Sequence, residues 1–272
     1  MRINIIGAGK VGQTLMRLIA GHDGYDVGSV SARRFETSAD AVNVIGAGKA
    51  AASVSDMEAA DLWFLTVPDD MISTVAEALS DAGAAPSMAV HCSGFSSSSV
   101  LAPLAEKGWR TASFHPVKSF ADPEVAAGSF IGTHCAIEGE EEAVATLWTF
   151  CEALGAIPFH VDPTKKALYH AAAVFSNNFS TLLQGIALEA YAASGVPHDI
   201  AEALCRTLLE GAAVNVARLG PQAALTGPAA RGDHAVLAAQ GAEVAAWSKD
   251  AGELYEVASR MALRLKSDGR AS

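Results

Sequence analysis

The sequence predicts an α/β N-terminal half built on a mainly parallel sheet, followed by an all-α C-terminal half. Up to about residue 160, short runs of apolar and β-branched residues alternate with helical stretches, as in a parallel sheet covered on both faces. After Asp162-Pro163 the chain changes to alanine- and leucine-rich segments without strand-like alternation. A length of 272 residues suits two domains, which we place at 1–162 and 163–272.

The expected elements follow from this pattern. Strands are predicted at residues 3–6, 26–30, 51–54, 62–67, 87–91, 111–114, 135–137 and 157–161. Long helical segments are predicted at 164–194, 198–219 and 233–266. Gly195-Val196-Pro197 and Gly220-Pro221 mark the ends of the first two, because glycine permits a left-handed cap and proline stops a helix.

Composition excludes several classes of protein. Half of the residues are apolar and 18% are charged, which suits a buried core and argues against extended disorder. A net charge of -11 disfavours a nucleic-acid partner or an anionic membrane surface. No apolar run reaches the roughly 18 residues of a membrane span, and a strand beginning near Arg2 leaves no room for a signal peptide, so a cytoplasmic location is expected. The four scattered cysteines predict free thiols and no metal site.

A glycine-rich turn joins the first strand to the first helix, with the sequence Gly7-Ala8-Gly9-Lys10-Val11-Gly12. In this context the spacing predicts the phosphate-binding loop of a Rossmann domain. Gly7 permits the tight turn, Gly9 lets the backbone approach a pyrophosphate, and Gly12 lets the helix pack on the strand. The N–H groups and the positive dipole end of the helix then face the phosphates. Turn glycines of another α/β protein are the alternative.

The end of the second strand favours NADP(H) over NAD(H). NAD-binding versions of this fold place an Asp or Glu there, about 20 residues after the loop, for the ribose 2'-hydroxyl. This chain reads Ser31-Ala32-Arg33-Arg34 instead. Guanidinium groups beside a hydroxyl suit a 2'-phosphate through charge-assisted bonds, so Ser31, Arg33 and Arg34 are predicted cofactor ligands. A solvated loop is the alternative.

The residues after the other strands bear on the rest of the pocket, because ligands of an open parallel sheet bind beyond the carboxyl ends of its strands. Val67 and Pro68 are expected beside the cofactor. Ser93, Gly94 and His115 are expected at its reacting end, where they contact the substrate.

These residues belong to a longer ordered set, by which the whole chain resembles proteins that join a Rossmann-like domain to a C-terminal domain of unknown function, number 2520. The matching segments are Gly7-Ala8-Gly9-Lys10-Val11-Gly12, Val67-Pro68-Asp69-Asp70, His91-Cys92-Ser93-Gly94, Ser113-Phe114-His115-Pro116, Leu168-Tyr169-His170-Ala171-Ala172-Ala173 with Ser176-Asn177-Asn178, and Leu225-Thr226-Gly227-Pro228-Ala229-Ala230-Arg231-Gly232-Asp233. The resemblance implies an NADP-dependent oxidoreductase-like protein, often a dimer, whose substrate is generally unassigned.

The chain is also distantly similar to the 6-phosphogluconate and 3-hydroxyisobutyrate dehydrogenase superfamily, which implies a helical domain like the C-terminal one of 6-phosphogluconate dehydrogenase. There a Ser-Gly after a strand touches substrate and a Lys-x-x-Asn-Asn helix carries catalysis. Ser93-Gly94 and Asn177-Asn178 match this pattern, whereas Val174 stands where the lysine is expected. The resemblance therefore does not identify a proton-transfer group in this chain.

A polar stripe marks the first C-terminal helix. Lys166, His170, Val174 and Asn177 recur at steps of three or four, which returns them to one face of an α-helix. The alanine-rich surroundings indicate burial, so the polar members need protein or ligand partners. His170 is either a satisfied core histidine or a catalytic group at the cleft between the domains. We take His170 as the first candidate acid/base and His115 as the second.

Together these residues predict reversible hydride transfer between NADP(H) and a small, anionic carbonyl, imine or alcohol substrate. Asn177 and Ser93 are expected to orient the substrate, and Arg231 is either a clamp for its anionic group or an internal partner of a carboxylate such as Asp233. The alternative is a non-catalytic NADP(H)-binding redox sensor or scaffold, which the missing lysine keeps open. The alanine- and leucine-rich helical half predicts a homodimer formed through it.

Overall fold

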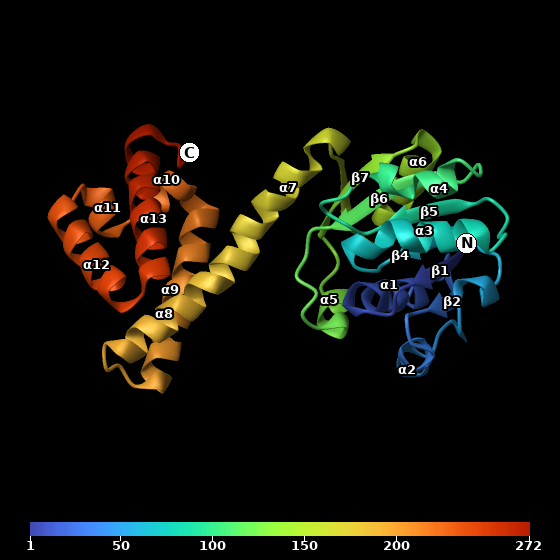
Figure 1. Cartoon of the computed structure of the whole chain (residues 1–272), viewed down its shortest axis with the longest axis horizontal. Helices are drawn as coiled ribbons and strands as arrows, with labels where there is room; N and C mark the ends of the chain where they lie inside the picture. Colours follow the sequence, from blue (N-terminus) through green and yellow to red (C-terminus); the bar gives the residue numbers. More distant parts are fainter. The chain divides into compact units, whose positions relative to one another are not determined.

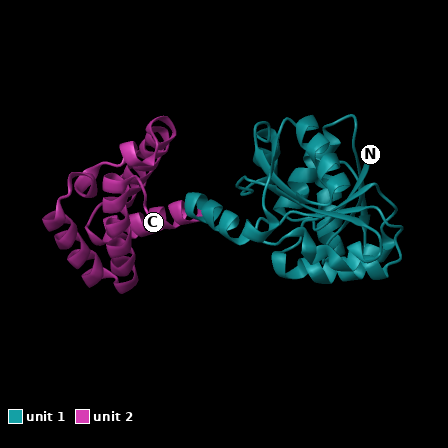
Figure 2. Ribbon diagram, turned by 90° about the horizontal axis from the view of Figure 1, so that it is seen from above, with its two compact units in different colours: residues 1–177 teal, residues 178–272 magenta.

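The computed structural model describes residues 1–272, which form two compact units, Met1–Asn177 and Asn178–Ser272 (Figure 2). The first unit holds an eight-stranded sheet with its covering helices, and the second is entirely helical (Figure 1). The predicted fold class is therefore confirmed. The domain boundary at 162/163, drawn from composition, stays a prediction. None of the helices combines the length and the apolar composition needed to cross a membrane.

The sheet has the strand order β3-β2-β1-β4-β5-β6-β7-β8. Its strands are β1 (Arg2–Ile6), β2 (Asp26–Ser31), β3 (Lys49–Ala51), β4 (Leu62–Leu65), β5 (Met88–His91), β6 (Arg110–Pro116), β7 (His134–Gly139) and β8 (Ile157–His160). All neighbouring strands run parallel except β6 and β7, which are antiparallel. The order reverses at β1, between β2 and β4, and such a switch point is where an open α/β sheet leaves a crevice for a ligand.

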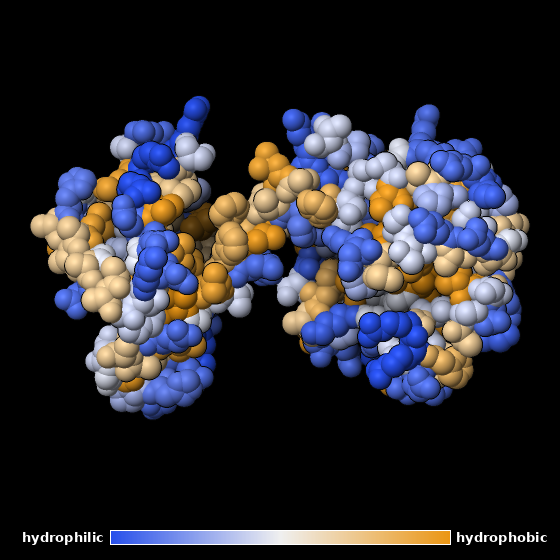
Figure 3. Space-filling model, viewed as in Figure 1, coloured by the Kyte–Doolittle hydropathy of each residue, from blue (hydrophilic) through white to orange (hydrophobic).

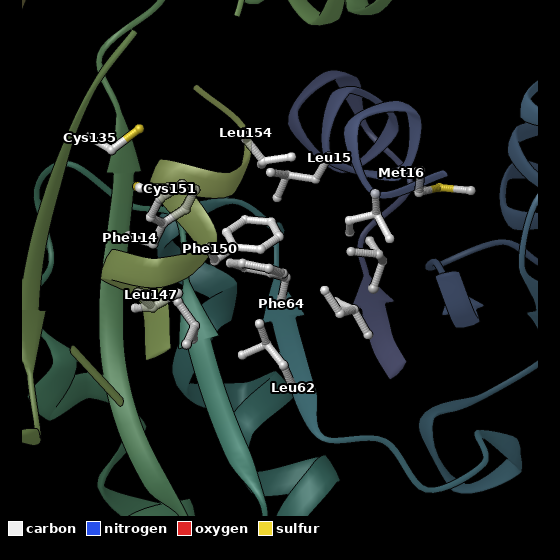
Figure 4. Packing of buried hydrophobic residues seen from close by; sticks show 14 of the residues in the cluster. Leu15, Met16, Leu62, Phe64, Phe114, Cys135, Leu147, Phe150, Cys151 and Leu154 are labelled. Carbon is white, nitrogen blue, oxygen red and sulfur yellow. The ribbon is translucent and has the colours of Figure 1, made fainter. Parts of the chain in front are cut away.

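Apolar clusters lie on both faces of the sheet, beneath its helices. The helices of this unit are α1 (Lys10–Ala20), α2 (Phe35–Ile45), α3 (Ile72–Asp81), α4 (Ala102–Ala105), α5 (Pro123–Gly128), α6 (Glu141–Ala153) and α7 (Lys166–Ala173). Every residue of β4 is buried, because successive side chains point to opposite covered faces. Phe64 packs with Phe114 and Phe150 in one cluster (Figure 4), and Trp63 packs with Trp109 in the other.

All eight strands occur with shifted ends, and two of the shifts bear on the site. Strand β6 runs to Pro116, because the antiparallel β7 pairs with it as far as that residue. His115 therefore lies inside a strand rather than beyond its end. The third strand, predicted at 51–54, is Lys49–Ala51, and Val54–Asp56 form a short 3-10 helix instead.

The second unit consists of helices joined by short turns. They are α8 (Ser180–Ala193), α9 (His198–Leu219), α10 (Pro221–Ala224), α11 (Gly227–Arg231), α12 (His234–Trp247) and α13 (Lys249–Asp268). Helix α9 agrees with the prediction. The segment 233–266, expected as one stretch, is two helices because the backbone of Ser248 is extended, and its Oγ accepts the N–H of Ala251 as the N-cap of α13.

Residues Val174–Phe179 form a π-helix between α7 and α8. The prediction of a regular helix over 164–194 is therefore wrong at this point. A π turn holds one residue more than an α turn, so residues beyond Val174 are rotated away from the positions that α-helical spacing gives them. Asn177 lies in this segment and is exposed, as is Phe175, so the expected buried face does not continue through it.

Candidate functional site

The glycine-rich turn has the geometry that its sequence predicts. Gly7 has a φ of +112°, and a Cβ there would lie 2.6 Å from the carbonyl oxygen of Thr66. A Cβ on Gly12 would meet the carbonyl oxygen of Gly7 at 1.9 Å, so only glycine lets α1 pack this closely. A Cβ on Gly9 would meet no atom within 4 Å, which leaves this stretch of backbone open to a ligand. The three glycines thus match the three separate requirements of a dinucleotide phosphate loop.

A cavity of about 570 Å³ opens beside this loop, at the carboxyl ends of β1, β2 and β4. Of the predicted cofactor residues, its lining includes Gly7, Ala8, Gly9, Ser31, Arg33, Arg34, Val67 and Pro68. Lys10, Val11 and Gly12 form the first turn of α1 and do not line it. No acidic residue lines this cavity, although the chain carries a net charge of -11. The charged residues in its lining are Arg33 and Arg34.

Sequence reasoning missed part of this cavity. Thr37 and Ser53 add hydroxyl groups to the lining, and Val54, Met71 and Val75 add apolar surface that suits a flat ring. Thr37 lies near the start of α2, and Ser53 follows β3. The strand-end rule finds Ser53 once β3 is placed correctly.

The loop after β5 carries Ser93 and Gly94. Ser93 is buried, and its Oγ accepts two backbone N–H groups of its own loop, at 3.0 and 2.9 Å. A Cβ on Gly94 would lie 2.5 Å from His170 Nδ1 and 2.8 Å from His115 Nε2. Gly94 is therefore the point at which the two predicted acid/base histidines converge, and the absence of a side chain makes that approach possible.

His115 and His170 have their ring centroids 5.6 Å apart, with the ring planes at 77°. His115 Nδ1 is hydrogen-bonded to the hydroxyl of Tyr169 at 2.8 Å, a partner that sequence reasoning missed although it precedes His170. His170 Nδ1 is buried without a hydrogen-bond partner, against Gly94. His170 is therefore not a fully hydrogen-bonded core histidine.

Burial, aided by the positive charges of His170 and Lys166, lowers the pKa of His115 to about 4. Burial also raises the pKa of its partner Tyr169 to about 12. Near pH 7 both groups are uncharged, so the contact between them is a hydrogen bond between neutral groups.

Two residues at the end of β5 are also held uncharged. His91 Nδ1 accepts the N–H of Ser93 at 3.1 Å, which leaves the ring proton on Nε2, 3.1 Å from the carbonyl oxygen of Ser97. Burial lowers the pKa of His91 to about 3. Burial raises the pKa of Cys92 to about 12, so this cysteine is a packed thiol and not a nucleophilic thiolate.

Asn177 and Arg231 lie in other helical segments. Asn177 is the last residue of the first unit, and Arg231 ends α11 in the second. The carboxylate of Asp233 does not pair with Arg231; it accepts the N–H of Val236 and caps α12. Both predictions for Arg231, as an anion clamp and as an internal partner of a carboxylate, stay predictions.

Two family models match the chain. Residues 1–116 match the Rossmann-like domain, and residues 133–262 match a domain of unknown function, DUF2520. The chain joins a Rossmann-like domain to a DUF2520 domain. The resemblance drawn from its motifs is confirmed, and α7, with Lys166, Tyr169 and His170, falls inside the DUF2520 match.

Solved structures of similar proteins share this architecture. The chain is 27% identical to protein TM1727 from Thermotoga maritima, with a TM-score of 0.77 over 98% of each chain. It is 22% identical to the "putative NADP oxidoreductase BF3122 from Bacteroides fragilis", with a TM-score of 0.80 over 97% of this chain and 98% of the other. It is 15% identical to a pyrroline-5-carboxylate reductase from Coxiella burnetii, with a TM-score of 0.61 over 96% and 97%. Comparison with curated proteins gives no match.

Proposed function

We propose that this protein is an NADP(H)-dependent oxidoreductase, which transfers hydride to or from a small carbonyl, imine or alcohol substrate that carries an anionic group. The observation that carries the proposal is the cavity beside the phosphate loop, which presents Arg33 and Arg34 and no carboxylate. Helix N-termini and guanidinium groups are the protein groups best suited to phosphates. With Ser31 beside them, the two arginines suit a ribose 2'-phosphate better than a 2'-hydroxyl.

The named activities of two structural neighbours support the same class. One neighbour is called an NADP oxidoreductase, and another reduces pyrroline-5-carboxylate, whose name describes a cyclic imine with a carboxylate. Both share the fold of this chain over almost its whole length. A small anionic imine or carbonyl compound is therefore the substrate class to test first.

When bound, the nicotinamide supplies or accepts the hydride. The residues of this chain then have to orient the substrate and move a proton to or from its oxygen or nitrogen. His170 is the proposed acid/base, and His115 is the second candidate. Ser93 and Asn177 are proposed to orient the substrate, and Arg231 to hold its anionic group.

Calorimetric titration with NADPH and NADH tests the cofactor. We expect NADPH to bind more tightly, and Arg33→Ala to weaken its binding by about 1.5–3 kcal/mol for each charge-assisted bond lost, which is roughly ten- to a hundredfold. NADH affinity should change little. Arg110→Ala is the matched control, because Arg110 pairs with Glu142 and does not line the cavity. Equal affinities of the wild-type protein for the two cofactors would reject the assignment.

Oxidation of NADPH with a panel of keto acids and cyclic imines, and reduction of NADP⁺ with hydroxy acids, tests turnover. At least one substrate is expected. His170→Ala should then lower kcat about a hundredfold or more at unchanged NADPH affinity, because general acid–base catalysis contributes about 10²–10⁴. His198→Ala is the control, since that histidine is 81% exposed. Tight NADPH binding without turnover of any compound would point to the non-catalytic sensor or scaffold.

We also propose that the helical unit forms a homodimer. Leu182, Leu208, Val214 and Leu219 are each more than half exposed. Figure 3 shows hydrophobic residues on the visible surface of this unit. Monomeric proteins seldom expose apolar surface on this scale, and a second copy related by a two-fold axis covers it with an identical surface.

A further inference from the structure

A lysine and a glutamate form a buried ion pair in the first unit. The side chain of Lys166 is 1% exposed and that of Glu138 is 5% exposed, and Lys166 Nζ lies 3.4 Å from Glu138 Oε1. The ammonium also donates to the carbonyl oxygen of Ser93 at 3.0 Å and to the hydroxyl of Ser113. The three N–H groups of the ammonium thus have three acceptors, which is the full capacity of a charged lysine.

The carboxylate of Glu138 binds a second residue, Ser98, that follows β5. Its two oxygens accept the backbone N–H and the hydroxyl of Ser98, both at 2.8 Å. The ion pair therefore joins four segments that are distant in the sequence: the start of α7, the loop after β5, the end of β7 and the middle of β6.

Lys166 begins α7, and two site residues of that helix follow it by three and four positions. This spacing places Tyr169 and His170 on the same helix face as Lys166. Tyr169 is hydrogen-bonded to His115, and His170 rests against Gly94. The contacts of the buried Lys166 ammonium thus lie at the start of the helix turn that carries Tyr169 and His170.

We propose that Lys166 is a positioning residue: paired with Glu138, it fixes the start of α7 to the loop after β5, and so holds Tyr169 and His170 in place against His115 and Gly94. This inference rests on the proposed function, in which the two histidines form the reacting end. Lys166 itself is buried, and its ammonium is taken up by Ser93, Ser113 and Glu138, so its proposed role is positioning and not catalysis.

Stability alone is a weak reason for such a pair, because the cost of removing two charges from water is often not recovered by their attraction. Lys166 also acts through its charge, since it is among the groups that lower the pKa of His115 and of His91. The titratable groups near His115 include Lys166, Tyr169 and His170 from α7 and His91 from β5, and the carboxylate of Glu138 from β7 pairs with Lys166. Loss of the ammonium should therefore raise the pKa of His115.

The test uses the full chain with the double substitution Lys166→Met and Glu138→Gln, which removes both charges while filling similar volumes. Lys166→Met alone is the second variant, and it leaves the carboxylate unpaired. Lys165→Met is the matched control, because this neighbouring lysine is exposed. Each protein is titrated with NADPH, its histidine ring protons are followed by NMR against pH, and kcat and KM are measured with any substrate found.

We expect both variants to bind NADPH as the wild type does. In Lys166→Met, which loses only the positive charge, the titration of His115 should move upward from about 4. In the double variant the ring signals of His115 and His170 should change and kcat should fall roughly tenfold or more. Lys165→Met should change none of these quantities. If His115 and His170 keep wild-type ring signals in the folded double variant, the proposal is wrong, even for an active enzyme. If the wild-type protein turns over no substrate, the proposed function fails, while the NMR titration still decides the role of Lys166.

Discussion

Replacing Gly94 with alanine tests whether turnover depends on the close approach of the His115 and His170 rings to residue 94. The added Cβ would lie 2.5 Å from His170 Nδ1 and 2.8 Å from both Nε2 and Cε1 of His115. These atoms belong to side chains that can turn, so the fold should survive the change. Inserting one methyl group into a packed place costs about 1–3 kcal/mol of unfolding free energy.

The larger effect of Gly94→Ala should fall on geometry. Contacts between non-bonded atoms are comfortable at about 3.5 Å, so His170 has to retreat by roughly 1 Å to accommodate the methyl group. A displacement of that size in a reacting group can lower the rate about a hundredfold. The phosphate loop and its cavity do not include Gly94, so NADPH affinity should be unchanged.

Steady-state kinetics, NADPH titration and thermal unfolding of Gly94→Ala provide the comparison. Gly128→Ala is the matched control, because Gly128 has no positive φ and a Cβ there would meet no atom within 4 Å. A Gly94→Ala protein with wild-type kcat would show that the reaction does not need the observed approach of His115 and His170. Equal loss of kcat and of NADPH affinity would instead indicate a general disturbance of the first unit.

Three further predictions concern the buried histidines, the hydrogen bond of Tyr169 and the homodimer. The pKa values of His91 and His115 are about 3 and 4 in the fold, against an ordinary 6.5, so between these values and pH 6.5 the unfolded chain binds more protons than the folded one. The free energy of unfolding should therefore be highest above about pH 6.5 and should fall as the pH is lowered toward 4, by up to about 1.4 kcal/mol per pH unit for each histidine. A free energy from urea unfolding that is constant from pH 7 to 5 would contradict this. Tyr169→Phe removes the hydrogen bond to His115 and should cost about 1 kcal/mol of stability and reduce turnover without affecting NADPH affinity, as calorimetry and kinetics can show. Light scattering at micromolar concentration should give twice the 28.0 kDa monomer mass, and a monomer mass would defeat the proposed homodimer.

The sequence predicts those parts of the site that short continuous segments of the chain form. Residues 7–12 form a strand-turn-helix in which each glycine has its own local reason, and Arg33 with Arg34 follows the next strand directly. Such features depend on neighbours in the chain, so spacing alone is informative. The presence of the strands and the helical second half follow from periodicity for the same reason.

What the sequence did not predict depends on contacts between distant segments. The end of β6 is set by pairing with β7, and the partners of Lys166 come from three other segments. The stripe on α7 identified Lys166 and His170 but not Tyr169, although Tyr169 stands three residues after Lys166, because helical spacing does not show which side chains meet His115 of β6. The π-helix over Val174–Phe179 has no signature in the spacing of apolar residues, and it removes the basis for placing Asn177 beside His170.

The charge states at the reacting end separate the roles of the two histidines. With a pKa of about 4, only about one His115 ring in a thousand is protonated at pH 7, so His115 is poorly placed to deliver a proton to a reduced substrate. Its neutral ring, hydrogen-bonded through Nδ1 to Tyr169, can instead bind a substrate oxygen or nitrogen through Nε2. Proton transfer then falls to His170. On this division, His115→Gln, which keeps a hydrogen-bonding group, should retain far more turnover than His170→Gln, and the reverse order would exchange the two roles.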